Sequence, residues 1–208
     1  FAFLLSSPIS LPKKTPMPTE NTFSALQPAF DALALLFLQP ETLGAAAQLP
    51  HAAEAILEAG GSLPQTSRNR LDEIAAGTPG SDLQLAQAYA KLFLGVGEKT
   101  IPLCESAWTS AQHLLCQGAE LECRRIYEDA GLELAGGSVV PEDHLGLMLG
   151  FLAVSALRGD VRTGLSFYQT HAAPLIPAIT EAIRARGKDA GPYLDVADLL
   201  DGIHQALS

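Results

Sequence analysis

The stretch PEDHLGLMLGFLAVSAL, residues 141–157, carries the clearest structural signal in this chain. Proline suits the first turn of a helix, and the two carboxylates that follow it suit the positive N-terminal end of a helix dipole. The uncharged apolar run over 145–157 is shorter than the roughly 20 residues that a membrane span needs. We therefore expect a helix from Pro141 to about Leu157 and no integral membrane segment.

Runs of apolar residues at helical spacing, bounded by proline or glycine, recur on both sides of this segment. They predict further helices at residues 24–38, 42–59, 64–76, 82–94, 105–115, 119–130, 160–171, 174–186 and 193–207. In the helix over 119–130, the expected core residues are Leu121, Ile126 and Tyr127. No run of alternating polar and apolar residues is convincing, so the sequence predicts an all-α fold, a single-domain bundle of about nine to ten helices.

The chain has 208 residues, which suits one compact domain. Residues 1–16 precede Met17 and an ordinary polar start, so we interpret them as an upstream extension or a cloning remnant. Their apolar beginning lacks the basic region of a secretory signal. The expected all-helical domain therefore spans residues 17–208.

The formal net charge is −10, with 48% hydrophobic and 17% charged residues. Such a field repels nucleic acid and attracts basic peptides or proteins, although an acidic surface also serves solubility alone. The three cysteines, Cys104, Cys116 and Cys123, contain no C-x-x-C pair. Reduced thiols and a cytoplasmic location are therefore expected, and nucleic acid is not an expected partner.

The familiar signatures of catalysis and nucleotide binding are absent from the sequence. Cys104 or Cys116 could pair with His113 or His144, but no third group that would orient such a pair is evident. Cys116 and Cys123 together with His113 match no usual zinc ligand pattern. The sequence therefore predicts no catalytic residue, no metal site and no enzyme.

Two groups of residues nevertheless suggest peptide binding. A helix over 105–115 would place Glu105 and Trp108 on one face, where a carboxylate beside an indole can hold an arginine. Pro141, Asp143 and His144 form the second group, at the start of the apolar helix. The residues alone favour a structural interpretation, in which Trp108 belongs to the core, Asp143 caps a helix and His144 is a hydrogen-bonded, partly buried ring.

Four segments resemble, in order and spacing, the TorD/DmsD family of redox-enzyme maturation chaperones, which is related to the nitrate-reductase assembly chaperones. They are YAKLFLG at 89–95, PLCESAW at 102–108, YEDAG at 127–131 and PEDHLG at 141–146. The resemblance extends over about residues 24–205. It implies an all-helical cytoplasmic chaperone of anaerobic respiration. Such a protein binds the twin-arginine signal peptide, the apo-form, or both, of a molybdopterin oxidoreductase of the dimethyl-sulfoxide or trimethylamine-oxide reductase type, assisting cofactor insertion and preventing premature export.

The same resemblance implies a surface for the signal peptide. Its residues would be Glu105, Trp108, Pro141, Asp143, His144 and His171. The family tends to place a histidine before a proline–tryptophan pair, and this chain has leucine instead of the tryptophan in the segment HAAPL at 171–175.

Other functions stay open at this point. One is a nitrate-reductase-type assembly factor that binds only the apoenzyme. Another is a protein that binds a guanine nucleotide or the molybdenum cofactor, which only the glycine loops at 95–97 and 136–137 favour. A cysteine-dependent hydrolase is a third. No cofactor is expected beyond weak association of such a nucleotide or cofactor, and the protein is expected to be a monomer or a domain-swapped homo-oligomer.

Overall fold

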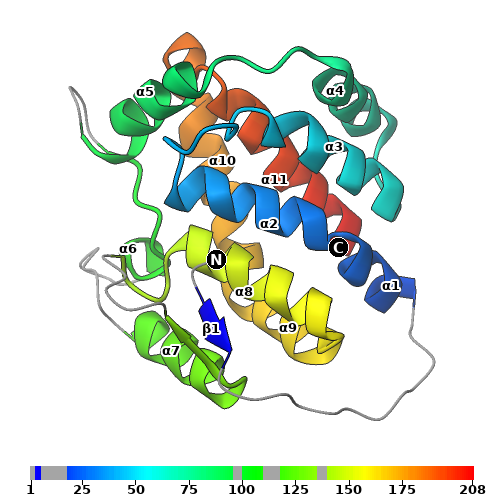
Figure 1. The fold of residues 1–208 in the computed structure, drawn as a ribbon, viewed down its shortest axis with the longest axis vertical. Helices are drawn as coiled ribbons and strands as arrows, with labels where there is room; N and C mark the ends of the chain where they lie inside the picture. The colour runs from blue at the N-terminus through cyan, green and yellow to red at the C-terminus, as the bar shows by residue number, and fades with distance from the viewer. Residues whose placement is uncertain (1–2, 6–17, 96–99, 110–117, 135–139) are drawn as a thin grey trace.

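The computed structural model describes residues 3–5, 18–95, 100–109, 118–134 and 140–208 (Figure 1). The helices are α1 Pro18–Ala25, α2 Gln27–Leu38, α3 Gln48–Ala59, α4 Gln65–Ala76, α5 Asp82–Phe93, α6 Ser106–Thr109, α7 Gly118–Asp129, α8 Leu145–Arg158, α9 Val161–Phe167, the π-helix η1 Tyr168–Ala172, α10 Ala173–Arg184, the 3-10 helix η2 Gly187–Ala190 and α11 Tyr193–Leu207. Because α6 is a single turn, ten longer α-helices remain in the described part, and the predicted all-α fold is confirmed.

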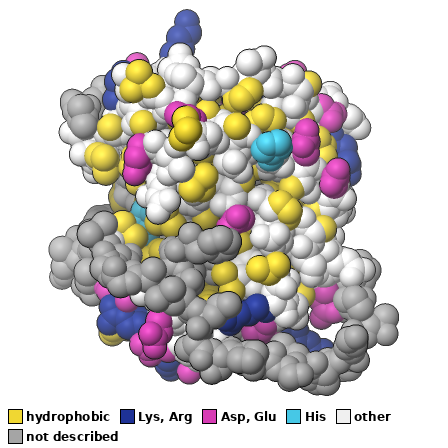
Figure 2. Space-filling view, in the orientation of Figure 1, with side chains coloured by type: hydrophobic (Ala, Val, Ile, Leu, Met, Phe, Trp, Pro, Cys, Tyr) yellow, Lys and Arg dark blue, Asp and Glu magenta, His cyan; other side chains and the backbone are white. Residues whose placement is uncertain are grey.

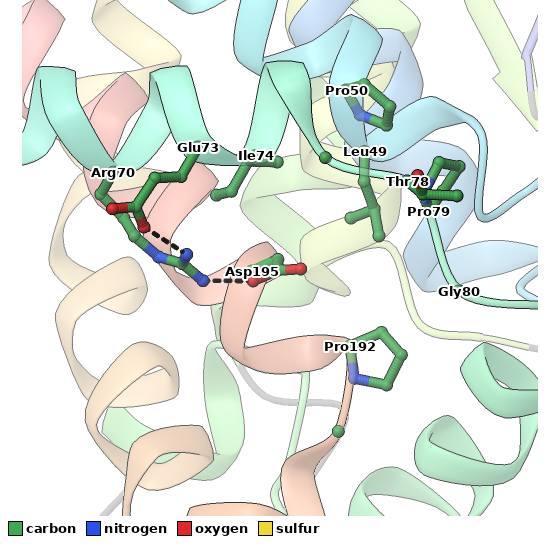
Figure 3. A pocket seen from close by; sticks show the side chains of 12 residues that line it. Leu49, Pro50, Arg70, Glu73, Ile74, Thr78, Pro79, Gly80, Pro192 and Asp195 are labelled. Carbon is green, nitrogen blue, oxygen red and sulfur yellow. Dashed lines mark hydrogen bonds and ion pairs between the residues drawn. The ribbon is translucent and has the colours of Figure 1, made fainter.

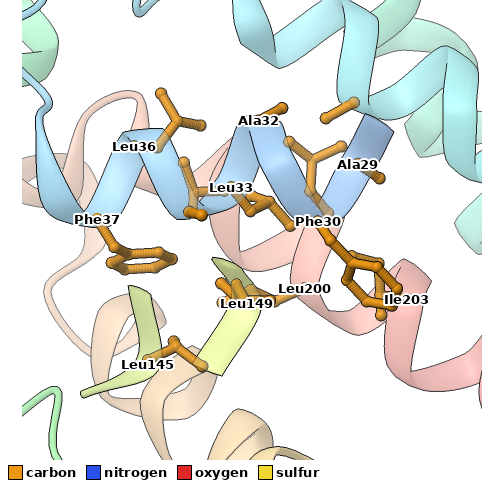
Figure 4. Close-up of a cluster of buried hydrophobic side chains, with 14 of the residues drawn as sticks. Ala29, Phe30, Ala32, Leu33, Leu36, Phe37, Leu145, Leu149, Leu200 and Ile203 are labelled. Atoms are coloured by element: carbon orange, nitrogen blue, oxygen red, sulfur yellow. The ribbon is translucent and has the colours of Figure 1, made fainter. Parts of the chain in front are cut away.

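Helix α2 lies at the centre of the molecule, between α3 and α8 (Figure 1). Its side chains Phe30, Leu33 and Phe37 are fully buried and face Leu149 of α8 and Leu200 of α11 (Figure 4). Burying each such side chain contributes about 1.5–3 kcal/mol. Most of the apolar run over 145–157 therefore belongs to the core, although Leu157 is 68% exposed. No described helix has the length and apolar character to cross a bilayer.

The helix predicted over 24–38 is two helices in the structure. α1 begins at Pro18, and Leu26 separates it from α2. Pro28 has no amide proton to donate to the preceding turn, which explains the interruption at this place. The predicted stop before Pro40 is confirmed, because α2 ends at Leu38.

The predicted start at residue 42 is wrong, because α3 begins only at Gln48. The carboxylate of Asp82 accepts hydrogen bonds from the backbone amides of Gly44 and Ala46, each at 2.8 Å. Gly44 has a φ of 85°, a left-handed conformation that no helix contains. A remote side chain thus holds residues 44–46 in turns, whereas the predicted end at Gly60 is confirmed.

The start predicted at Pro141 is also wrong, since α8 begins at Leu145. An antiparallel bridge joins Cys104 to His144. Around it, the Glu105 amide donates to the Asp143 carbonyl at 3.0 Å and the Leu145 amide donates to the Leu103 carbonyl at 2.8 Å. These bonds hold His144 in an extended conformation, and residues 141–144 form a turn in which the His144 amide donates to the Pro141 carbonyl at 3.1 Å.

The other predicted helices differ less from the observed ones. The helix predicted over 105–115 is described only in its first turn, which is α6. Residues 110–117 lie outside the described part. The helix predicted over 160–171 is α9 followed by the π-helix η1. Leu121 is 61% exposed, so its assignment to the core was wrong, whereas Tyr127 is buried and Ile126 is partly buried.

A small antiparallel ladder joins β1, Phe3–Leu5, to β2, Leu132–Leu134. No strand was expected in either segment. Three residues are too few for the alternation that marks a strand in a sequence. The ladder leaves the all-α class unchanged.

Candidate functional site

The two motif segments over 102–108 and 141–146 meet at the start of α6. The buried carboxylate of Asp143 accepts a hydrogen bond from the backbone amide of Ser106 at 2.7 Å. Asp143 thereby satisfies one of the unpaired amides at the N-terminus of α6. It is a helix cap, as the structural interpretation had it, although it caps α6 and not its own helix.

A short hydrogen bond joins the side chains of Glu105 and His171 at this place. Oε2 of Glu105 lies 2.8 Å from Nδ1 of His171, and the two side chains are 12% and 2% exposed. The His171 ring also packs against the ring of Phe167, with 4.9 Å between the centroids. The Glu105 carboxylate therefore pairs with a histidine 66 residues away in the chain.

His171 lies in the π-helix η1, Tyr168–Ala172. π-Helical turns are rare and occur frequently at functional sites. The predicted helix over 160–171 gave no indication of this change of winding, because no simple residue pattern marks a π turn.

Cys123 of α7 completes a cluster with Glu105 and His171. The potential ligand atoms of the three residues all lie within 4.8 Å of one another. Burial, reinforced by the negative charges of Glu105 and Asp143, raises the pKa of the Cys123 thiol far above its ordinary value. This thiol is protonated at neutral pH, which is unfavourable for the cysteine-dependent hydrolase considered above.

Cys123 was grouped with Cys116 and His113 on the basis of sequence. Both of those residues lie outside the described part of the chain. Neither the pair Glu105 and His171 nor the approach of Cys123 was predicted. The spacing in sequence contained no signal for them, because the three residues belong to different segments of the fold.

His144 is buried at the start of α8. Its Nδ1 accepts a hydrogen bond from the Gly146 amide at 3.1 Å, so its ring caps the helix. Burial lowers the pKa of His144 to about 4, and the neighbouring Asp143 opposes this only in part. The neutral ring that results suits the capping role.

Trp108 and Pro141 are both partly exposed. The indole Nε1 of Trp108 donates to the Pro102 carbonyl at 3.0 Å, and its ring packs against the core. Among the six predicted site residues, Glu105, Trp108 and Pro141 keep exposed surface, whereas Asp143, His144 and His171 are buried. A role of all six in peptide binding stays a prediction.

A depression of about 580 Å³ opens beside His171, between α7 and the α9–η1 segment. His171 and Phe167 are its buried lining residues, and its charged side chains are Glu122, Arg125 and Arg162. Two cations and one anion do not make the acidic rim that a doubly cationic peptide would need at this depression.

A second depression, of about 260 Å³, lies between α4 and the start of α11 (Figure 3). Its guanidinium, Arg70, binds Asp198 at 2.8 Å, Glu73 at 3.0 Å and also Asp195. The arginine is thus fully engaged with carboxylates of its own chain. None of the six predicted site residues lines this depression.

On the face seen in Figure 2, acidic side chains are spread among apolar ones and not gathered in one patch. The glycine loops that favoured nucleotide binding fall largely outside the described residues, at 96–99 and 135–139. Gly95 is described and has a φ of 77°, as a turn requires.

The fold and the site together define an all-helical protein, in which the Asp143 cap and the buried hydrogen bond between Glu105 and His171 hold distant segments in place. Residues 46–181 match the family described as nitrate reductase delta subunit, and the chain belongs to this family. The family is one of molybdoenzyme assembly chaperones and not of enzymes, which confirms the resemblance to the TorD/DmsD type. No curated protein matches the chain.

Proposed function

We propose that the chain is a cytoplasmic chaperone that binds the twin-arginine signal peptide and the apo-form of a molybdopterin oxidoreductase of the dimethyl-sulfoxide or trimethylamine-oxide reductase type. In this role it assists cofactor insertion and prevents premature export. One observation supports the proposal most. The family match over residues 46–181 includes all six predicted site residues, and contacts join the segments that carry them.

The partly exposed members of the site supply the chemistry that an arginine-bearing peptide needs. Trp108 offers an aromatic face and Glu105 a carboxylate, which suit cation–π stacking and a charge-assisted hydrogen bond. The buried residues position the exposed ones, since Asp143 holds the start of α6 and His171 orients Glu105. The net charge of −10 would speed the approach of a cationic leader.

Isothermal titration calorimetry tests the proposal directly. The titrants are synthetic twin-arginine leaders of the molybdoenzymes encoded in the same genome. We expect micromolar or tighter affinity for one of them, and weaker binding as salt rises. The same leader with both arginines replaced by lysine should bind at least tenfold more weakly, because lysine lacks the planar fork of arginine.

Trp108→Ala should weaken the binding by about tenfold or more, because it removes the aromatic face. Leu43→Ala is the matched control, since this apolar side chain is 94% exposed and outside the site. Circular dichroism confirms that both variants keep their helical content. The absence of heat with every leader, or equal affinity for the lysine leader, would contradict signal-peptide recognition.

The family match specifically favours a second candidate, an assembly factor that binds only the apoenzyme. In that case the protein captures the cofactor-free catalytic subunit equally well with and without its leader. A pull-down with the two forms of the subunit distinguishes the candidates, because a signal-peptide chaperone loses affinity when the leader is removed.

A further inference from the structure

We propose that Glu105, Cys123 and His171 bind one divalent transition-metal ion of the zinc type. This site goes beyond the proposed function and does not depend on it. A peptide-binding test and a metal-binding test can therefore fail independently.

The geometry of the cluster is close to that of a metal site. Zinc bonds of about 2.3 Å to sulfur and about 2.0–2.2 Å to nitrogen or oxygen place tetrahedral ligand atoms about 3.5 Å apart. In the cluster the ligand atoms lie within 4.8 Å of one another. Metal binding therefore requires the more distant ligand atoms to approach by about 1 Å. The 2.8 Å hydrogen bond between Glu105 and His171 must also open to the spacing of two ligands, and rotation of the side chains can supply both changes.

The donor set indicates which metal fits. One thiolate, one imidazole and one carboxylate combine a soft, an intermediate and a hard donor. Zn²⁺ accepts all three types, whereas Mg²⁺ and Ca²⁺ take oxygen ligands almost alone. Three protein ligands also leave the fourth tetrahedral position to a water molecule or to a group of a partner.

Charge balance favours the same ion. On binding, the Cys123 thiol loses its proton and His171 binds as the neutral imidazole. The resulting thiolate and the Glu105 carboxylate carry two negative charges, which the divalent cation neutralises. An ion therefore leaves no net charge in a place where Cys123 and His171 are buried.

Access to the cluster is available on one side. The depression beside His171 reaches this residue from solvent, and Glu105 retains 12% exposure. The placement of His171 in a π-helix is an independent feature that is frequent at functional sites. Bound metal would tie α7, the start of α6 and η1 together, and so would stabilise the arrangement of the motif segments.

The test is a titration of the full chain, after removal of metals with a chelator, with Co²⁺ and then with Zn²⁺. We expect one equivalent of Co²⁺ to produce the visible bands of a tetrahedral ion and a thiolate-to-cobalt charge-transfer band. Zn²⁺ should displace the cobalt and raise the midpoint of urea unfolding, because the ion binds the folded state.

Variants locate the ion. Cys123→Ser should abolish the charge-transfer band, and His171→Gln or Glu105→Gln should weaken Co²⁺ binding about tenfold or more. The controls are Cys104→Ser and Cys116→Ser, which should keep both the band and the affinity. Should Cys123→Ser not fold, the other two ligand variants decide the question by the same titration.

Three outcomes would overturn the site. The first is a stoichiometry far below one with no charge-transfer band, which would leave Glu105 and His171 as a structural hydrogen-bonded pair. The second is an unchanged band in folded Cys123→Ser. The third is loss of the band in Cys116→Ser with Cys123→Ser unaffected.

Discussion

Oε2 of Glu105 lies 2.8 Å from Nδ1 of His171, although the two residues are 66 positions apart in the chain. The pair connects the loop before α6 to the π-helix η1. With Asp143 bound to the Ser106 amide, it fixes the segment that carries Trp108 from two sides. The predictions below test these two contacts and the packing around them, in the presence of a chelator so that metal does not contribute.

Glu105→Ala should lower the free energy of unfolding by about 1–3 kcal/mol, because it leaves a buried imidazole nitrogen without its partner. Urea denaturation at neutral pH measures the loss. Glu54→Ala is the control, because its ion pair with His51 is exposed and should change stability by no more than about 0.5 kcal/mol. Equal stability of the two variants would show that the buried pair contributes nothing.

Asp143→Ala should destabilise the protein by about 1–3 kcal/mol, since the buried Ser106 amide loses its acceptor. Asp143→Asn retains an acceptor oxygen and should lose less. Urea denaturation of both variants shows whether Asp143→Asn is the more stable of the two, as expected. If the asparagine variant were the less stable of the two, the charge of Asp143 and not its capping bond would be the important property.

The pKa of His144 predicts a pH dependence of stability. The folded pKa of about 4 lies below the ordinary value of 6.5, so the unfolded chain binds a proton on His144 before the folded chain does. Stability is therefore fully present above pH 6.5 and falls as the pH drops towards 4, by about 3 kcal/mol from this residue.

His144→Asn isolates this contribution, because asparagine can still cap α8 but does not titrate. Urea denaturation at several pH values between 7.5 and 4 should show a shallower decline for the variant. Parallel curves for the two proteins would contradict a buried, neutral His144.

Gly164→Ala should destabilise the protein by about 1–3 kcal/mol through overpacking. An added Cβ would lie 2.4 Å from Cζ of Phe23 and 3.0 Å from Cβ of Ser155. Gly118→Ala is the matched control, since among the described residues no atom outside its own helical turn and its chain neighbours lies within 4 Å of the Cβ position. It should be neutral or stabilising by up to about 1 kcal/mol. Thermal or urea unfolding of both variants shows whether the lack of space around residue 164, and not the loss of a glycine as such, causes the destabilisation.

Much of the fold could be predicted because helix formation depends on neighbours within a few residues. The helix over 193–207 was predicted with its observed bounds, and the Ser81 cap of α5 is present as a capping box with Gln84. The predicted helix ends before Gly60 and Gly131 also follow from local conformation, because each of these glycines has a positive φ. The family resemblance similarly depended on short segments, and it is confirmed.

The sequence by itself thus determined the helical class, most helix ends and the two motif segments over 102–108 and 141–146. Only the tertiary structure decided where α3 and α8 begin, because Asp82 and the bridge from Cys104 to His144 bind backbone groups that a local pattern assigns to helices. It also decided that Glu105 meets His171 and Cys123. Such contacts depend on how the loop before α6, α7 and η1 pack together, and spacing along the chain does not encode the distance between residues on different segments.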